Sequence, residues 1–257
     1  MRWNMIDLHV HLIGHMDRLA TRENIRDYLE QARISKIRQI GFADHDLYWD
    51  QLDLPLIREV ASEYPDLQVR VGLEAEYSVG QEYSLSQMIK SFEFDYIIGS
   101  VHEIGDWAFD YPSEERAHFQ QDSDELYSKY FALVEKAACS GLFSIVGHFD
   151  LIKIFNARPK TDVRILAARA LEAIKDNGLV VEINTNGRYK PVNEFYPEIK
   201  LLEEMKKMEI PFTLGSDAHE AKVVGRDLWE ARGILKTLGV KELIGFKKQR
   251  QELFCIE

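Results

Sequence analysis

Hydrophobic and polar positions along the chain alternate between two patterns from one end to the other. Amphipathic stretches, in which apolar residues recur at helical spacing, are separated by short runs rich in β-branched residues. Segment 21–37 is typical of the first pattern, because Ile25, Tyr28, Leu29 and Ala32 share one face behind Thr21, a plausible N-cap. Segment 39–46 follows it as a strand and loop. This alternation predicts parallel strands joined by crossover helices.

The same unit recurs along the rest of the chain. After the first strand, which begins at Met5, further buried strands are predicted within segments 67–77, 94–104, 142–152, 178–187 and 210–219. Helices are predicted within segments 124–141, 162–178 and 197–209, which precede the last three strands. Six or seven such units favour a barrel-like α/β fold. No linker, repeat or low-complexity tract interrupts them, so we expect one domain over residues 1–257.

Composition narrows the class of protein. With 257 residues and 46% hydrophobic content, the chain is able to bury one full core. A formal net charge of -11 argues against a broad nucleic-acid-binding face, although a local basic pocket is still able to hold a small anion. No apolar run is long enough for a signal peptide or a membrane span, which predicts a cytoplasmic protein. Cys139 and Cys255 lie far apart, so neither a disulfide framework nor a thiolate zinc site is expected.

Polar side chains follow every strand-like run, at the point where each run ends. They are His9 and His11, His45, Glu74, His102, His148, Glu182 and Asn184, and finally Asp217 and His219. In a parallel α/β barrel the loops after the strands form one face, where active sites collect. The sequence therefore predicts that these groups converge on one mouth of the barrel.

The histidines indicate which chemistry this mouth supports. One histidine after a strand is usually structural, but seven of the eight histidines lie in or just after strand-like runs. Imidazole and carboxylate ligands without thiolate suit zinc, manganese or iron, and so many ligands exceed what one ion accepts. Several divalent ions would make a positive pocket that attracts an anion. Metal clusters of this kind activate water and neutralise charge in phosphate ester hydrolysis.

The ordered motifs "DLHVH", "ADHD", "GLEAEY", "GSVHEIGDWAFD", "VGHFDLI", "EINTNG" and "LGSDAH" resemble the PHP superfamily, and in particular its monofunctional histidinol phosphatases. The resemblance covers nearly the whole chain. It implies a distorted (β/α)7 barrel that holds two to three divalent transition metals (Zn, Mn or Fe). It also implies hydrolysis of L-histidinol phosphate to L-histidinol and inorganic phosphate, in histidine biosynthesis, with metal-bound hydroxide as nucleophile.

The resemblance also implies a ligand set for each metal. One ion would be held by His9, His11, Glu74 and Asp217, and a second by Glu74, His102 and His148. The third would be held by His15, His45 and His219. Among these residues, Glu74, Asp217 and His219 are expected to act directly in catalysis.

Several neighbouring residues leave two interpretations open. Asp7 and Asp44 precede ligands, and each either orients an imidazole from behind or caps a loop. Glu76 shares a strand face with Glu74, and only the family pattern favours Glu74 as the ligand. His118 matches no metal motif, so we expect a solvated helix residue, with a substrate contact or a proton relay as the alternative.

Residues for substrate binding are expected on the same face. Arg158 and Arg188 follow strands and resemble positions that bind phosphate in the histidinol phosphatases, and the planar guanidinium suits phosphate. Trp107, Phe109 and Asp110 would form an apolar wall and an anionic partner for a substrate with an imidazole and an amine. A plain hydrophobic lid is equally consistent with this loop.

The expected partner is a small-molecule phosphate, with neither nucleic acid nor membrane, and the sequence leaves the oligomeric state undefined. Two alternatives stay open. One is a PHP phosphoesterase that acts on another small phosphate, such as a nucleotide or sugar phosphate. The other is a non-catalytic accessory module with a retained metal site.

Overall fold

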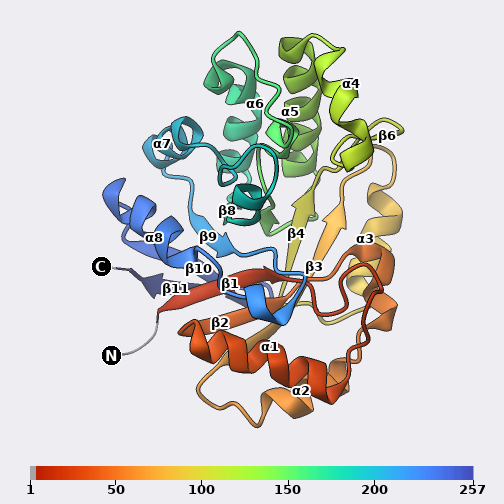
Figure 1. The fold of residues 1–257 in the computed structure, drawn as a ribbon, viewed down its shortest axis with the longest axis vertical. Coiled ribbons are helices and arrows are strands. Elements are labelled where there is room, and N and C mark those ends of the chain that lie inside the picture. Colours follow the sequence, from red (N-terminus) through yellow and green to blue (C-terminus); the bar gives the residue numbers. More distant parts are fainter. Residues whose placement is uncertain (1–3, 257) are drawn as a thin grey trace.

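A seven-stranded parallel sheet forms the centre of the computed structural model, which describes residues 4–256 (Figure 1). Each strand pairs in parallel with the next along the chain. In spatial order the strands are β1 (Met5–Val10), β2 (Ile37–Phe42), β3 (Gln68–Glu76), β4 (Tyr96–Ser100), β7 (Ile145–Val146), β8 (Val180–Asn184) and β9 (Phe212–Gly215).

Helices connect these strands and cover the outside of the sheet. They are α1 (Arg22–Ile34), α2 (Leu54–Ala61), α3 (Glu82–Lys90), α4 (Glu115–Phe119), α5 (Ser123–Cys139), α6 (Val163–Asp176), α7 (Ile199–Lys207) and α8 (Leu228–Thr237). Short 3-10 turns are η1 (Asp46–Gln51), η2 (Pro112–Glu114), η3 (Leu151–Lys153), η4 (Asn186–Tyr189) and η5 (Ala221–Val223). Two hairpins complete the fold, β5 (Glu103–Ile104) with β6 (Trp107–Ala108) and β10 (Glu242–Lys247) with β11 (Arg250–Cys255). Helices α1 and α2 lie at one end of the view in Figure 1, and α5 and α6 at the other.

The helix boundaries follow local sequence signals. Helix α1 begins where the Thr21 side chain accepts a hydrogen bond from the Asn24 backbone N–H at 3.2 Å. Asp122 and Asp162 cap α5 and α6 in the same way. The predicted inner face of α1 is confirmed, since Ile25, Tyr28, Leu29 and Ala32 are all buried.

The barrel closes between the first and last strands of the sheet at the carboxyl ends. A parallel bridge joins Val10 to Ala218, where the His11 N–H donates to the Ala218 carbonyl at 2.9 Å and the Ala218 N–H donates to the His9 carbonyl at 3.4 Å. The predicted distorted seven-stranded α/β barrel is therefore confirmed, with a nearly closed sheet surrounded by helices.

The hairpin β10–β11 packs into the amino end of the barrel, a feature that the hydrophobic pattern did not predict. Ile244 and Phe246 of β10 join an interior cluster that lies inside the curled sheet. The other members of this cluster are Leu8, Ala43, Tyr96, Ile98, Ile145 and Val180. The Phe246 N–H also donates to the Gln39 side chain at 2.9 Å, which fixes the hairpin against β2. The hairpin thus fills one end of the barrel.

Tyr96 provides a stability test of this interior packing. Its hydroxyl donates to the Leu8 carbonyl at 2.6 Å, and a methyl group added to Gly41 would overlap that hydroxyl. We expect Gly41→Ala to lower the free energy of unfolding by about 1–3 kcal/mol, because overpacking strains a fully buried ring. In a Tyr96→Phe background the same change should cost less. Urea unfolding of the four proteins measures both effects, and equal losses in the two backgrounds would contradict this account of the packing.

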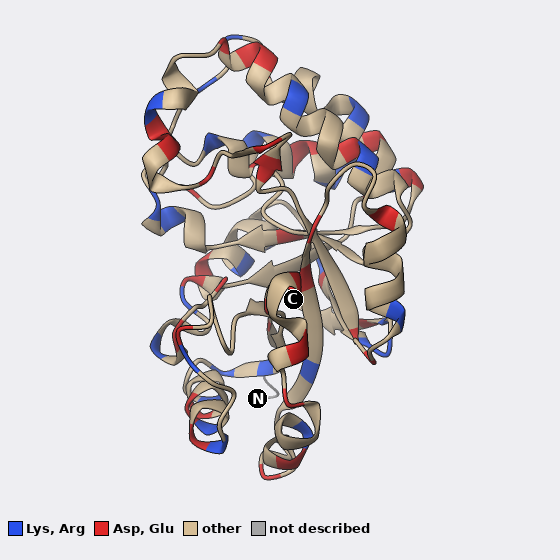
Figure 2. Ribbon diagram, turned by 90° about the vertical axis from the view of Figure 1, so that its right-hand side faces the viewer, with Lys and Arg blue, Asp and Glu red and all other residues tan. Residues whose placement is uncertain are grey.

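Most charged residues lie on the outside of the fold, whereas a few, such as Asp7, Glu74 and Glu182, are buried. Figure 2 shows acidic and basic segments interspersed over the outer helices and loops, while the strands are mostly uncharged. None of the helices within residues 4–256 is long and apolar enough to cross a bilayer.

Candidate metal centre

His9, near the end of β1, and His11, directly after it, point to the same side of the sheet, toward the mouth of the barrel. Residues two apart on a strand share a face, and both His9 and His11 are fully buried there. The Nε2 atom of His9 lies 3.2 Å from Glu74 Oε2. The Nε2 atom of His11 lies 3.5 Å from the same oxygen and 3.2 Å from Asp217 Oδ1. A carboxylate of β3 and another from the loop after β9 therefore meet this histidine pair.

Glu74, on β3, lies among the imidazoles of the candidate metal centre. Its Oε2 atom faces His9 and His11, together with His45 Nδ1 at 3.0 Å. Its Oε1 atom faces a different pair of imidazoles, His148 Nε2 at 3.0 Å and His102 Nε2 at 3.5 Å. One carboxylate thus lies between two groups of histidines, as a ligand shared by two ions would.

A third group of imidazoles lies beside the first. His11 stacks on His219 with ring centroids 4.1 Å apart. His15, on the exposed loop after β1, lies 5.0 Å from His45 and 4.9 Å from His219 by the same measure. All nine residues that the sequence nominates as ligands are therefore gathered at one mouth of the barrel.

The donor atoms of this centre fit divalent metal ions. Three groups have ligand atoms within 4.8 Å of one another, namely His9 with His11 and Glu74, Glu74 with His102 and His148, and His11 with His45 and His219. The Nε2 atoms of His9, His11, His45 and His219 and the Oε2 atom of Glu74 are buried without a hydrogen-bond partner. Buried polar atoms are rarely left unpaired, and these donors are the types that zinc, manganese and iron accept.

The two carboxylates are held in their ionised form. Burial opposes ionisation of Glu74, but His9 and His45 outweigh it and hold the pKa of this carboxyl well below its usual range. Burial likewise opposes ionisation of Asp217, and His9 and His11 lower its pKa well below the ordinary value. Both side chains thus present anionic oxygens to the centre.

Two further carboxylates orient the imidazoles from behind. Glu182 Oε1 lies 2.8 Å from His9 Nδ1, and Glu76 Oε2 lies 2.6 Å from His102 Nδ1. Such pairs fix the ring so that Nε2 faces the metal. In this geometry Glu74 faces the centre, whereas Glu76 lies behind His102. The strand pattern alone did not distinguish these two glutamates. From the sequence, Glu182 was identified only as a polar residue at the end of a strand. Its place within a run of β-branched residues was the signal that this carboxylate is buried.

Asp7 and Asp44 cap the loops that carry the ligands. Asp7 accepts from the backbone N–H groups of Ser216 and Gly225, and Asp44 accepts from those of Leu12, Ile13 and Gly14. Burial raises the pKa of each carboxyl to about 6. Of the two interpretations that the sequence left open, these contacts match loop capping.

The structure corrects the expectation for His118. This residue was expected on a solvated helix face, but it is fully buried, and its Nε2 lies 2.8 Å from the Phe109 carbonyl. The short helix α4 packs its ring against Trp107, with centroids 5.1 Å apart. Phe109 is also fully buried, against Tyr130, so it supports the loop from behind and forms no exposed wall.

Trp107 and Asp110 of this loop are half-buried. The indole N–H of Trp107 donates to Glu114 at 2.8 Å, which fixes the ring.

The two nominated arginines lie on loops after strands and are already paired with carboxylates. Arg158 contacts Glu194 at 2.7 Å and Glu198 at 2.8 Å. Both terminal nitrogens of Arg188 donate to Glu230 at 2.6 Å. A phosphate at either guanidinium would therefore have to compete with, or join, these acidic partners.

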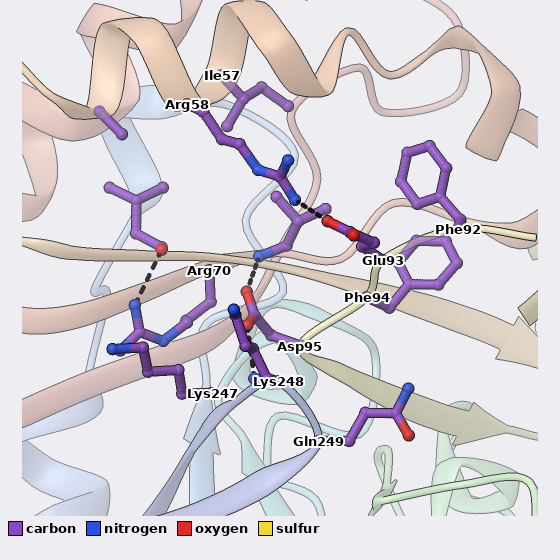
Figure 3. A pocket seen from close by; sticks show the side chains of 13 residues that line it. Ile57, Arg58, Arg70, Phe92, Glu93, Phe94, Asp95, Lys247, Lys248 and Gln249 are labelled. Atoms are coloured by element: carbon purple, nitrogen blue, oxygen red, sulfur yellow. Dashed lines mark hydrogen bonds and ion pairs between the residues drawn. The ribbon is translucent and has the colours of Figure 1, made fainter. Parts of the chain in front are cut away.

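A cavity of about 640 Å³ lies away from this centre, at the amino ends of β3 and β4 (Figure 3). Several of its charged residues have internal partners: Arg58 contacts Glu93 at 2.9 Å, and Asp95 accepts from the backbone N–H groups of Val71 and Lys248. The candidate chemistry is therefore located by the histidines and not by this hollow.

Comparison with known proteins agrees with this geometry. A family model described as the PHP domain matches residues 7–186. A probable histidinol-phosphatase of Deinococcus radiodurans is 38% identical over 232 residues, which cover 85% of this chain and 86% of that protein. A histidinol-phosphatase of Lactococcus lactis subsp. lactis is 29% identical over 261 residues, 94% of each protein.

A solved structure is similar over nearly the full length. It is histidinol phosphate phosphatase from Lactococcus lactis subsp. lactis in complex with zinc, L-histidinol and phosphate. The match has a TM-score of 0.80 and 25% sequence identity, and it covers 97% of this chain and 99% of that chain.

Proposed function

Because this chain belongs to the PHP domain family, we propose that it is a metal-dependent phosphatase that hydrolyses L-histidinol phosphate to L-histidinol and inorganic phosphate. The observation that supports this most directly is the position of Glu74 between two groups of histidines. The zinc, L-histidinol and phosphate in the Lactococcus lactis structure support the same substrate. A role in cytoplasmic histidine biosynthesis is part of this proposal.

Three ligand sets would hold the metals. Glu74, His9, His11 and Asp217 would surround one ion, and Glu74, His102 and His148 a second. His15, His45 and His219 would surround the third. When bound, these ions would activate a water molecule as nucleophile and neutralise charge on the phosphate. Two to three ions of zinc, manganese or iron are proposed.

Residues of the chain outside the ligand sets would bind the rest of the substrate. Trp107 would contact the imidazole, and Asp110 would pair with the amine. His118 lies behind Trp107 and would support it, with no direct contact to the substrate in this arrangement. Arg158 and Arg188 would bind the phosphate oxygens that the metals leave free.

Phosphate release from L-histidinol phosphate by the purified, zinc-supplemented chain tests this function. We expect inorganic phosphate and L-histidinol in equal amounts, and loss of the reaction after chelation. Faster turnover of a nucleotide or sugar phosphate would favour another small substrate. Metal binding without turnover of any of these phosphates would indicate an accessory module.

The arginines provide a separate test of the phosphate pocket. We expect Arg158→Ala and Arg188→Ala each to lower kcat/KM by on the order of 10²-fold, because phosphoryl transfer spreads charge over oxygens that a guanidinium binds in pairs. Metal content should not change, since neither residue is in a ligand group. Arg169→Ala is the matched control, as this exposed arginine of α6 also pairs with a glutamate, Glu135, at 2.7 Å. Near-native kinetics in both variants would place the phosphate elsewhere.

A further inference from the structure

One carboxylate oxygen of Asp217, Oδ2, accepts hydrogen bonds from two side-chain amides. Its Oδ1 atom faces His11, while Oδ2 accepts from Asn184 Nδ2 at 3.3 Å and from Asn186 Nδ2 at 3.2 Å. Asp217 also lies in the left-handed region, with a φ of 52°. A residue other than glycine rarely adopts this conformation without surrounding contacts that hold it there. The two amides are such contacts.

The direction of each amide is set by a neighbour that donates a hydrogen bond. Asn184 Oδ1 accepts from the Asn186 backbone N–H at 3.0 Å, so its NH₂ group is turned the other way, where it donates to Asp217 and to Glu182, each at 3.3 Å. Asn186 Oδ1 accepts from Arg226 Nη2 at 3.1 Å. Because a guanidinium only donates, it forces the amide oxygen of Asn186 toward itself and the NH₂ group toward the carboxylate.

Arg226 is itself held against the η4 turn, which contains Asn186 and Tyr189. Its guanidinium stacks on the Tyr189 ring at 3.4 Å, and its carbonyl accepts from the Thr185 hydroxyl at 2.8 Å. The Tyr189 hydroxyl in turn donates to Asp227 at 2.7 Å. The Nε atom of Arg226 is buried without a partner, so its cationic group is retained at a cost in solvation. A residue that only packed against the turn would not need this charge.

We propose that Asn186 and Arg226 are positioning residues for Asp217, acting in series to aim its Oδ1 atom at the metal. This inference rests on the metal binding of the proposed function and extends it to residues that lie outside all three ligand groups. Arg226 acts on Asp217 only through the amide of Asn186. Asn186 and Arg226 lie 40 positions apart in the sequence, so only the fold brings them together.

Zinc affinity of the full-length protein, measured by competition with a chromophoric chelator, tests the proposal without using substrate. We expect Asn186→Ala to weaken the binding of the Asp217-held zinc by about 10- to 100-fold, the range for contacts that orient a ligand. Arg226→Ala should weaken it by about 10-fold, and Arg226→Lys should restore part of the loss, since lysine still donates to the amide oxygen. The double variant should bind zinc no more weakly than Asn186→Ala alone, because the two residues act in one chain.

Arg232→Ala is the matched control, because Arg232 also stacks on an aromatic ring and donates to a carbonyl but has no contact with Asn186. Its zinc affinity should equal that of the wild type. Wild-type affinity in both Arg226 variants, or losses that multiply in the double variant, would overturn the proposal. Failure of the wild type to bind zinc would overturn the proposed function as well, so the two failures are distinguishable.

Discussion

Glu74→Gln should lower kcat/KM on histidinol phosphate by on the order of 10⁴-fold, because one carboxylate would serve two metals and each site should lose at least the ~10²-fold typical of a disturbed ligand shell. Glutamine fills the same volume but presents a neutral amide to two groups of imidazoles. The hydroxyl of Ser100, which donates to Glu74 Oε1 at 2.8 Å, would still find an acceptor if the amide oxygen faced it. The NH₂ group would then face His9, His11 and His45, where it is unable to bind a metal.

Elemental analysis of the same variant should show a loss of metal together with the loss of activity. Wild-type protein is expected to contain two to three equivalents, and Glu74→Gln at most one. Glu76→Gln is the matched control, two residues along the same strand, since Glu76 contacts His102 and belongs to none of the three groups. It should lose only about 10- to 100-fold in metal affinity. Full metal content in Glu74→Gln would contradict the shared-ligand arrangement.

L-Histidinol phosphate should be turned over with a kcat/KM about 10⁴-fold higher than that of p-nitrophenyl phosphate, since a site that pairs with polar groups discriminates strongly against substrates that lack them. Trp107 and Asp110 would provide this discrimination. The hydrogen bond from Trp107 to Glu114 and the buried ring of His118 fix the indole before substrate arrives. A fixed contact avoids the entropic cost of ordering a loop on binding.

Steady-state kinetics on both substrates measure this ratio. Asp110→Asn should lower kcat/KM for histidinol phosphate and leave the value for p-nitrophenyl phosphate unchanged, because only the first substrate has an amine. Comparable values for the two substrates in the wild type would count against a dedicated biosynthetic phosphatase.

The sequence predicted the strands and the meeting of the histidines at one mouth, because both depend on short-range periodicity. A strand places alternate residues on one face, and parallel strands end at one edge, so His9, His11, His45, Glu74 and Asp217 could be assigned to one mouth without knowledge of packing. The α1 face and its Thr21 cap are equally local features.

Features that depend on distant contacts were not predictable in this way. His118 is buried because α4 folds against Trp107 and Phe109, and nothing in the spacing of residues 114–121 indicates this. Arg158 and Arg188 each pair with a glutamate about 40 positions away in the sequence, and Arg226 and Asn186 are separated from each other by a similar distance. The hairpin that fills the barrel is antiparallel, so it falls outside the repeating strand and helix unit.

A short backbone bridge joins the first and last strands of the barrel, and residues of the candidate metal centre flank this bridge on both sides. His9 and His11 come from the start of the chain, whereas Asp217 and His219 come from beyond residue 210. An ion held by both pairs would add a further link between the two ends of the sheet, beside the two backbone hydrogen bonds of the bridge and the contacts of Asp7 with Ser216 and Gly225. Metal supply would then govern how long the chain survives as a folded molecule as well as how fast it reacts, since whatever binds only the native state stabilises it by mass action.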